Sequence, residues 1–251
     1  MSPSQNVARR LYVLDFGLFQ VHDNGRVIGI PGYFIEAGDE ARILVDAGFP
    51  PWYRDDPDAA SREDGLGEFG RILKLDAENF PEAQLARIGV RPKDVTHLVV
   101  THGDIDHVGF VHEFTHATIV VGEAERNAGP PRYFGGKSRM RWPKDATYRL
   151  IVEDTEIAPG VTVLPTPGHS VGHVSLRVRL PSTGTMILAA DAINRAEELE
   201  TGLNSGGSDQ ELALESTRRL LEMTRAEQAF LVYGHDPEQW NTLDKAPRFY
   251  C

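Results

Sequence analysis

The sequence predicts a layered α/β or α+β domain, and two observations support this. Short apolar runs rich in β-branched residues recur along the whole chain, and each has the length of a buried strand. Helical patterns are fewer and lie between these runs. Many strands with a few intervening helices are typical of a layered domain. The expected strands are residues 8–14, 33–37, 42–45, 95–100, 118–121, 161–164, 174–178, 186–189 and 230–232.

Two segments are predicted to be helical. Residues 81–88 have Pro81 in a plausible first turn. Residues 208–225 begin with a capping box formed by Ser208 and Glu211, and part of an apolar stripe follows. The stripe consists of Leu212, Leu220 and Met223.

Composition limits the classes of function. The formal net charge of -11 disfavours a nucleic-acid partner, because an acidic surface repels phosphate backbones. The single cysteine, Cys251, rules out an intrachain disulfide and disfavours thiolate ligation of a metal. The length fits one domain over residues 1–251.

The sequence near the N-terminus also bears on location. The apolar stretch 11–14 is too short for a signal peptide and ends at Asp15, and nothing approaches a membrane span. We therefore expect a cytoplasmic, soluble protein that does not bind membranes.

The most informative stretch is residues 101–107, with the sequence THGDIDH. Four side chains that can bind a metal follow the apolar run 95–100 within six residues: His102, Asp104, Asp106 and His107. Without a cation, carboxylates packed this closely would repel one another or lose hydration on burial. A bound metal removes both costs. This stretch therefore predicts a metal site.

Three further residues that can bind a metal also come directly or shortly after an apolar run: His169, Asp191 and His235. Taken singly, a histidine after Pro-Gly is more often a turn residue, and an aspartate after a strand is more often a helix cap. Taken with the THGDIDH stretch, the ordered set predicts ligands gathered at one sheet edge.

This order of motifs resembles the metallo-β-lactamase superfamily, and within it most closely the N-acyl homoserine lactonases. The early segment LVDAG at 44–48 resembles a turn that is usually structural and near the site. The other segments that carry the likeness are 167–173 (PGHSVGH), 212–214 (LAL), 234–239 (GHDPEQ) and 246–250 (APRFY). The resemblance implies an α+β fold arranged as a four-layer αβ/βα sandwich.

The resemblance also implies two divalent metals per chain. Site one would be held by His102, Asp104 and His169, and site two by Asp106, His107 and His235. Asp191 would bridge both metals, and a hydroxide between them would be the nucleophile. Asp106 would double as a proton shuttle to the leaving group. His173, the second histidine of PGHSVGH, would support the ligands or the core.

Two residues depart from the family pattern. Asp104 stands where the family has histidine, and its extra negative charge favours iron or manganese relative to zinc at site one. Asn194 stands where homoserine lactonases carry a tyrosine that contacts the substrate carbonyl. Asn194 can still donate a hydrogen bond, but it is shorter. The change at Asn194 therefore bears on the prediction of an acyl-homoserine substrate and leaves the prediction of metal-dependent hydrolysis intact.

We therefore expect a hydrolase acting on a small-molecule lactone or related cyclic ester, with Asp106, Asp191 and Asn194 as catalytic residues and zinc as the first choice of metal. A di-iron redox protein, prompted by Asp104, and a metal-poor binding or regulatory relative are the alternatives. The oligomeric state is open between monomer and homodimer.

Two segments, 50–80 and 127–147, are expected to be irregular and rich in aromatic residues. Because small-molecule sites need apolar walls with a few polar anchors, we expect Tyr133, Phe134 or Trp142 to line a cleft over the metals, and Asn194 to point into it.

Overall fold

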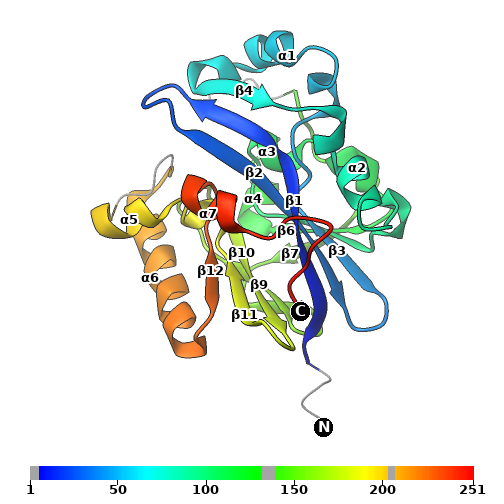
Figure 1. The fold of residues 1–251 in the computed structure, drawn as a ribbon, viewed down its shortest axis with the longest axis vertical. Coiled ribbons are helices and arrows are strands. Elements are labelled where there is room, and N and C mark those ends of the chain that lie inside the picture. The colour runs from blue at the N-terminus through cyan, green and yellow to red at the C-terminus, as the bar shows by residue number, and fades with distance from the viewer. Residues whose placement is uncertain (1–5, 132–138, 203–206) are drawn as a thin grey trace.

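Two β-sheets face each other at the centre of the computed structural model, which describes residues 6–131, 139–202 and 207–251. The seven-stranded sheet runs in the order β4-β1-β2-β3-β5-β6-β7 and the five-stranded sheet in the order β12-β11-β10-β9-β8 (Figure 1). The first sheet contains β1 (Ala8–Val21), β2 (Val27–Ala37), β3 (Ala41–Val45), β4 (Gly70–Lys74), β5 (His97–Val100), β6 (Thr118–Gly122) and β7 (Thr147–Ile151). The second contains β8 (Thr155–Ala158), β9 (Val161–Pro165), β10 (Val174–Leu180), β11 (Gly184–Leu188) and β12 (Phe230–Val232).

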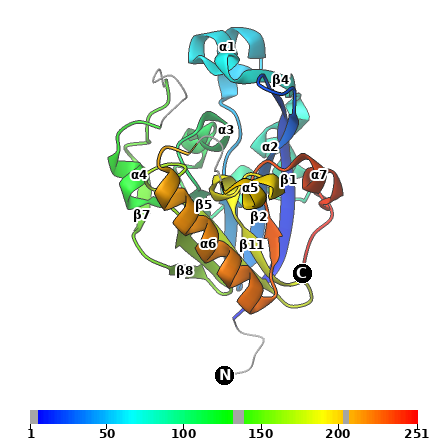
Figure 2. The ribbon, with the colours of Figure 1, turned by 90° about the vertical axis from the view of Figure 1, so that its left-hand side faces the viewer.

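Helices cover the outer face of each sheet, which gives the four layers expected of an αβ/βα sandwich (Figures 1 and 2). The described helices are α1 (Pro57–Asp64), α2 (Pro81–Ala86), α3 (Ile105–Val108), α4 (Glu123–Asn127), α5 (Ala196–Thr201), α6 (Gln210–Glu227) and α7 (Pro237–Thr242). One apolar cluster fills the space between the sheets, where Val13 and Val99 of the first sheet join Leu176 of the second. Separate clusters lie under the helices, for example Leu220 of α6 against Ile187 of β11.

All nine expected strands are present, but three others were missed: β4, β7 and β8. The segment 50–80 is therefore more regular than expected, since it contains α1 and β4. In β4 only Gly70 is fully buried, so the strand lacks an apolar run. It forms because β1 continues past its expected end and offers Phe19 and Gln20 as pairing partners for Ile72 and Arg71.

The predicted cap of the long helix was wrong by one residue. The carboxylate of Asp209 accepts the backbone N–H groups of Glu211 and Leu212, each at 3.1 Å. Ser208 instead donates its hydroxyl to the carbonyl oxygen of Gly168 at 3.2 Å. Leu212 is 39% exposed, so it does not belong to the buried stripe, whereas Leu220 does.

Gly168 shows why this helix can lie against the loop that carries His169. Its φ is +132°, and a Cβ there would lie 2.2 Å from the backbone nitrogen of Ala213 in α6. Only glycine allows both the backbone conformation and the close approach. The helix and the loop are therefore fixed relative to each other.

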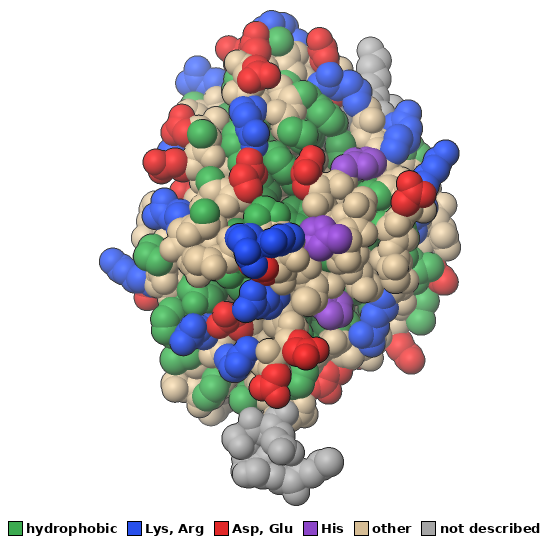
Figure 3. Space-filling view, turned by 90° about the vertical axis from the view of Figure 1, so that its right-hand side faces the viewer, with side chains coloured by type: hydrophobic (Ala, Val, Ile, Leu, Met, Phe, Trp, Pro, Cys, Tyr) green, Lys and Arg blue, Asp and Glu red, His purple; other side chains and the backbone are tan. Residues whose placement is uncertain are grey.

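The surface is mixed in charge: Figure 3 shows acidic and basic side chains interspersed over one face. Among the helices in the described ranges, none is long and apolar enough to cross a membrane.

Candidate metal centre and cleft

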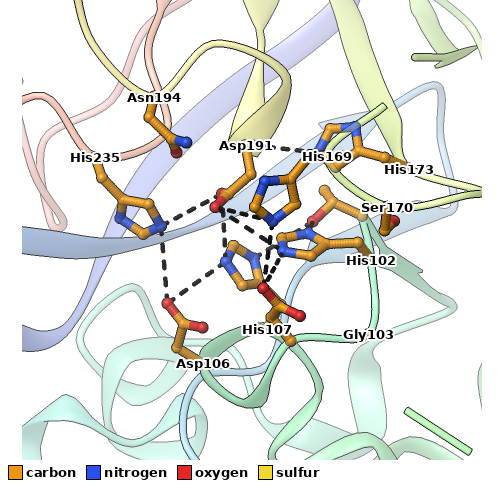
Figure 4. A network of polar contacts seen from close by, with 12 residues as sticks. His102, Gly103, Asp106, His107, His169, Ser170, His173, Asp191, Asn194 and His235 are labelled. Atoms are coloured by element: carbon orange, nitrogen blue, oxygen red, sulfur yellow. Dashed lines mark hydrogen bonds and ion pairs between the residues drawn. The ribbon is translucent and has the colours of Figure 1, made fainter. Parts of the chain in front are cut away.

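The predicted ligands meet where strands of both sheets end. His102 and Asp104 follow β5, and the short helix α3 then carries Asp106 and His107. His169, Asp191 and His235 follow β9, β11 and β12, which run in the same direction. Figure 4 shows the side chains from the two sheets pointing toward one another. The fold therefore brings the seven predicted site residues to one place, between the ends of the two sheets.

The carboxylate of Asp191 lies between two pairs of histidines. Its Oδ2 is 3.9 Å from Nε2 of His102 and 3.6 Å from Nε2 of His169. Its Oδ1 is 3.5 Å from Nε2 of His107 and 3.3 Å from Nε2 of His235. Each oxygen therefore faces a different pair (Figure 4), which is the arrangement that a carboxylate shared by two cations requires.

The other two aspartates each lie beside one of these pairs. Asp104 Oδ2 is 3.2 Å from Nε2 of His169 and 3.5 Å from Nε2 of His102. Asp106 Oδ2 is 3.5 Å from Nε2 of His107 and 3.7 Å from Nε2 of His235. The geometry thus sorts the side chains into the two sets expected for site one and site two.

The donor atoms fit metal ions better than they fit one another. Three histidines have Nδ1 engaged: His102 with Thr101 Oγ1 at 3.0 Å, His107 with Asp46 Oδ2 at 2.8 Å, and His235 with the Gly29 carbonyl at 2.9 Å. Their Nε2 atoms face the carboxylates. Those of His102 and His107 are buried and make no hydrogen bond within the described part of the chain.

The distances and charges within the two groups of donor side chains also indicate that they fit metal ions. Two ligands of one tetrahedral zinc, each about 2.1 Å from it, would lie about 3.4 Å apart, close to the observed separations. Asp104, Asp106 and Asp191 bring three carboxylates to the site, and each forms ion pairs with these histidines. Cations would balance their charge, so the residues present fit two divalent metals.

Behind the ligands, Asp46 holds the THGDIDH stretch in place. Its Oδ1 accepts the backbone N–H of Thr101 at 2.8 Å, and its Oδ2 contacts His107 Nδ1. Asp46 is 1% exposed and has a positive φ of 60°. This strained, buried residue belongs to the LVDAG turn, which lies against the site as expected.

His173 supports the shared carboxylate from another side. Its Nε2 accepts the backbone N–H of Asp191 at 3.1 Å, and its Nδ1 contacts Thr166 Oγ1 at 2.9 Å. Burial and the nearby His102 and His169 lower the pKa of His173 well below its ordinary value. His173 is therefore neutral and can accept this hydrogen bond.

The sequence analysis missed one residue that joins the two ligand loops, Glu125. Its Oε1 accepts the backbone N–H of Gly103 at 2.8 Å. Its Oε2 accepts the Ser170 hydroxyl at 2.6 Å and the Gly172 backbone N–H at 3.1 Å. The available signal was a glutamate three residues beyond the end of a buried strand, β6, whose neighbour β5 carries His102.

Charges within the site shift the protonation equilibria of the metal-free protein. Burial acts to lower the pKa of His169, but Asp191 and Asp104 outweigh it and raise that pKa to about 9. Burial acts to raise the pKa of Asp191, but the surrounding histidines, led by His235, hold it well below its ordinary value. The metal-free site therefore favours protonation of His107, His169 and His235, and a cation must displace those protons.

A cleft of about 450 Å³ opens over the two sites. Asp104, Asp106, His169, Asp191 and His235 contribute to its floor, and Asn194 lines it beside them as predicted. Asn194 is held through its backbone: its N–H donates to Glu198 Oε2 at 2.8 Å, and its carbonyl accepts the His235 N–H at 2.9 Å.

The aromatic wall of the cleft differs from the prediction. Trp142 does not line it, because the ring is buried in the core under the seven-stranded sheet and its Nε1 donates to the Gly129 carbonyl at 2.8 Å. Tyr133 and Phe134 lie outside the described residues. The aromatic lining is instead Phe19, Phe49 and Phe69.

Comparison with protein families places this geometry among known proteins. The model of the metallo-β-lactamase superfamily matches residues 26–235. An N-acyl homoserine lactonase of Bacillus thuringiensis is 33% identical over 237 residues, which cover 90% of this chain and 89% of the relative. The N-acyl homoserine lactonase AttM of Rhizobium radiobacter is 28% identical over 96% of this chain and 98% of its own length.

Solved structures with a similar fold include the same class of enzyme as these relatives. An N-acyl homoserine lactone hydrolase with the product N-hexanoyl-L-homoserine bound at its catalytic metal centre superposes with a TM-score of 0.86 at 30% identity, covering 97% of this chain and all of that one. AidC, a dizinc quorum-quenching lactonase, shares the fold with a TM-score of 0.67 at 17% identity over 97% of each chain.

Proposed function

The chain belongs to the metallo-β-lactamase superfamily, and from this membership we propose that it is a dinuclear metal-dependent hydrolase that opens a lactone ring. The observation that carries the proposal is Asp191, whose two oxygens face two separate pairs of histidines. The named activity of the relatives supports a lactone as the substrate. It also favours a hydrolase over a di-iron redox protein.

We assign each metal to one set of side chains. His102, Asp104 and His169 would hold one cation, Asp106, His107 and His235 would hold the other, and Asp191 would be available to both. When bound, the two cations polarise the ester carbonyl and lower the pKa of a water so that it attacks at neutral pH. Zinc fits the histidine-rich donor set, and the carboxylate of Asp104 favours iron or manganese at site one.

The chain's own residues bind and orient the substrate and move one proton. Asp106 is part of the cleft lining, so its carboxylate can pass a proton to the ring oxygen as the C–O bond breaks. Asn194 lies on the same floor, where its amide N–H can donate to the carbonyl oxygen of the substrate. The apolar side chains above them exclude water from the rest of the substrate.

The test compares metal content and turnover in matched variants. Asp191→Ala and His107→Ala should lose turnover of a lactone panel and retain less metal. The control is His116→Ala, which replaces an exposed histidine outside both ligand sets and should behave as the parent protein. An Asp191→Ala protein that keeps both metals and full turnover would overturn the assignment. A panel of linear esters of matched size separates lactonase from general esterase activity.

The role of Asn194 has its own test. Asn194→Tyr should raise kcat on acyl-homoserine lactones if these are poor substrates of the parent, because the phenol reaches further than the amide. An unchanged or lower rate would show that Asn194 does not occupy the position that contacts the carbonyl.

A further inference from the structure

The outer half of the cleft has a chemistry that the metal centre does not explain. Beyond the ligands, the lining comes mainly from the β1–β2 hairpin and the segment before β4, and Phe49, Ile105, Asn194 and Arg195 complete it. Most of these side chains are apolar, and four carry charge: Asp23, Arg26, Glu68 and Arg195. A cleft that bound only substrates with an uncharged side chain would not need charged groups at this position.

Arg26 is the charged residue whose guanidinium has no partner. Its backbone is held in the hairpin, since its N–H donates to Asn24 Oδ1 at 3.0 Å and its carbonyl accepts the Val21 N–H at 2.9 Å. Its side chain forms no hydrogen bond, ion pair or cation–π contact among the described residues, although it is partly buried and the protein is strongly acidic. Guanidinium groups in clefts are well suited to bind carboxylates.

Arg195, on the same cleft, provides the contrast. Its side chain is 13% exposed and lies 2.7 Å from Glu197 and 3.7 Å from Glu198, so its charge is balanced. It is also close enough to repel Arg26: burial, followed by the charge of Arg195, lowers the pKa of Arg26, and the opposing effect of Glu197, Glu198 and Asp236 does not offset them. An anion beside Arg26 would relieve both effects.

The two acidic groups in the outer part of the cleft, Asp23 and Glu68, form no ion pair with Arg26 among the described residues. They would repel a negative charge placed elsewhere in the outer cleft. The favourable position for an anion is therefore confined to the reach of Arg26.

We propose that Arg26 forms a carboxylate-binding subsite, and that the preferred substrate is a lactone whose side chain ends in an anionic group. The inference rests on the proposed function. The ring lies over Asp191 and Asn194, the chain passes along the apolar wall of Phe19 and Phe69, and the terminal carboxylate pairs with Arg26.

The experiment uses two probes of equal length on the metal-loaded protein. One is N-octanoyl-homoserine lactone, and the other is the same molecule with a carboxylate in place of the terminal methyl group. Arg26→Gln should lower kcat/KM for the carboxylate probe roughly tenfold more than for the octanoyl probe, mainly through KM, and Arg26→Lys should recover part of the loss. Added salt should weaken only the carboxylate preference. Arg71→Gln, on the neighbouring strand β4, is the matched control.

Different failures have different meanings. If the parent protein opens both lactones and Arg26→Gln changes them equally, the subsite is wrong and the hydrolase stands. If neither lactone is opened, calorimetric binding of the mono-amide of octanedioic acid decides: binding that Arg26→Gln weakens keeps the subsite, and binding that it leaves intact overturns it.

Discussion

Replacing Glu125 tests whether the two ligand loops depend on one buried carboxylate. Glu125 is 6% exposed, and its three hydrogen bonds come from Gly103, Ser170 and Gly172. Gly103 lies between two ligands of site one, and Ser170 follows the third. Glu125→Ala would therefore release both loops of site one together.

The expected loss in the free energy of unfolding follows from these three hydrogen bonds. Hydrogen bonds to a charged group contribute about 1.5–3 kcal/mol each, and a buried donor left without an acceptor costs about 1–3 kcal/mol. Removing the carboxylate also removes the cost of burying its charge, so we expect Glu125→Ala to lower the free energy of unfolding by about 3–5 kcal/mol. Glu125→Gln keeps one oxygen for Ser170 and Gly172 but turns an amide toward the Gly103 N–H, which should cost about 1–3 kcal/mol.

The assay is urea unfolding with and without a chelator, combined with metal analysis. Metal should leave site one at lower chelator concentration in Glu125→Gln than in the parent, while site two keeps its metal. Glu123→Ala, an exposed glutamate on the same helix, is the control and should change stability by less than about 1 kcal/mol. Equal urea midpoints and equal metal contents for Glu125→Ala and the parent would refute the reasoning.

Three further predictions follow from the same geometry. Asp104→Ala should empty site one while site two keeps its metal, and Asp104→His should shift the preference toward zinc, as measured by elemental analysis; if neither variant changes metal content, Asp104 is not a ligand. In the metal-free protein the pKa of His169 is raised to about 9 from an unfolded value near 6.5, so its stabilisation is complete below pH 6.5 and is lost toward pH 9. Calorimetry should show the metal-free Tm falling over that range while the gain on adding zinc grows; a metal-free Tm that rises instead would contradict it. Gly172→Ala should destabilise by about 1–3 kcal/mol in urea, because its Cβ would lie 2.0 Å from the Glu125 nitrogen; a parent-like midpoint would mean that the loop can move away.

The candidate ligands could be picked out from the sequence because each has a local signal. His169, Asp191 and His235 each follow an apolar strand, and such strands deliver their ends to one sheet edge. Glu125 has only its place three residues after the buried strand β6 as a signal, and Arg26 has none. Their importance depends on which loops lie opposite them, and no local pattern encodes that.

The fold shows the same limit at β2. Gly29, Pro31 and Gly32 would normally end a strand, so the sequence predicts a strand only from residue 33. In the structure the strand continues through these residues, and the two glycines leave room for aromatic rings that are distant in the sequence. A Cβ on Gly29 would lie 2.2 Å from the Trp240 ring, and one on Gly32 would lie 2.1 Å from Phe16. The glycines serve packing partners that local sequence does not reveal.

Asp104 shows how geometry bears on a role that the sequence position alone does not determine. It occupies the N-cap position of α3, where an aspartate ordinarily accepts N–H groups of the first turn. Its side chain makes no such bond and turns instead to His102 and His169. Giving up a cap costs about 0.5–2 kcal/mol. A carboxylate placed among buried histidines stabilises the protein most when a bound cation balances its charge. The orientation of Asp104 is therefore not that of a cap, and it agrees with the proposed role as a ligand.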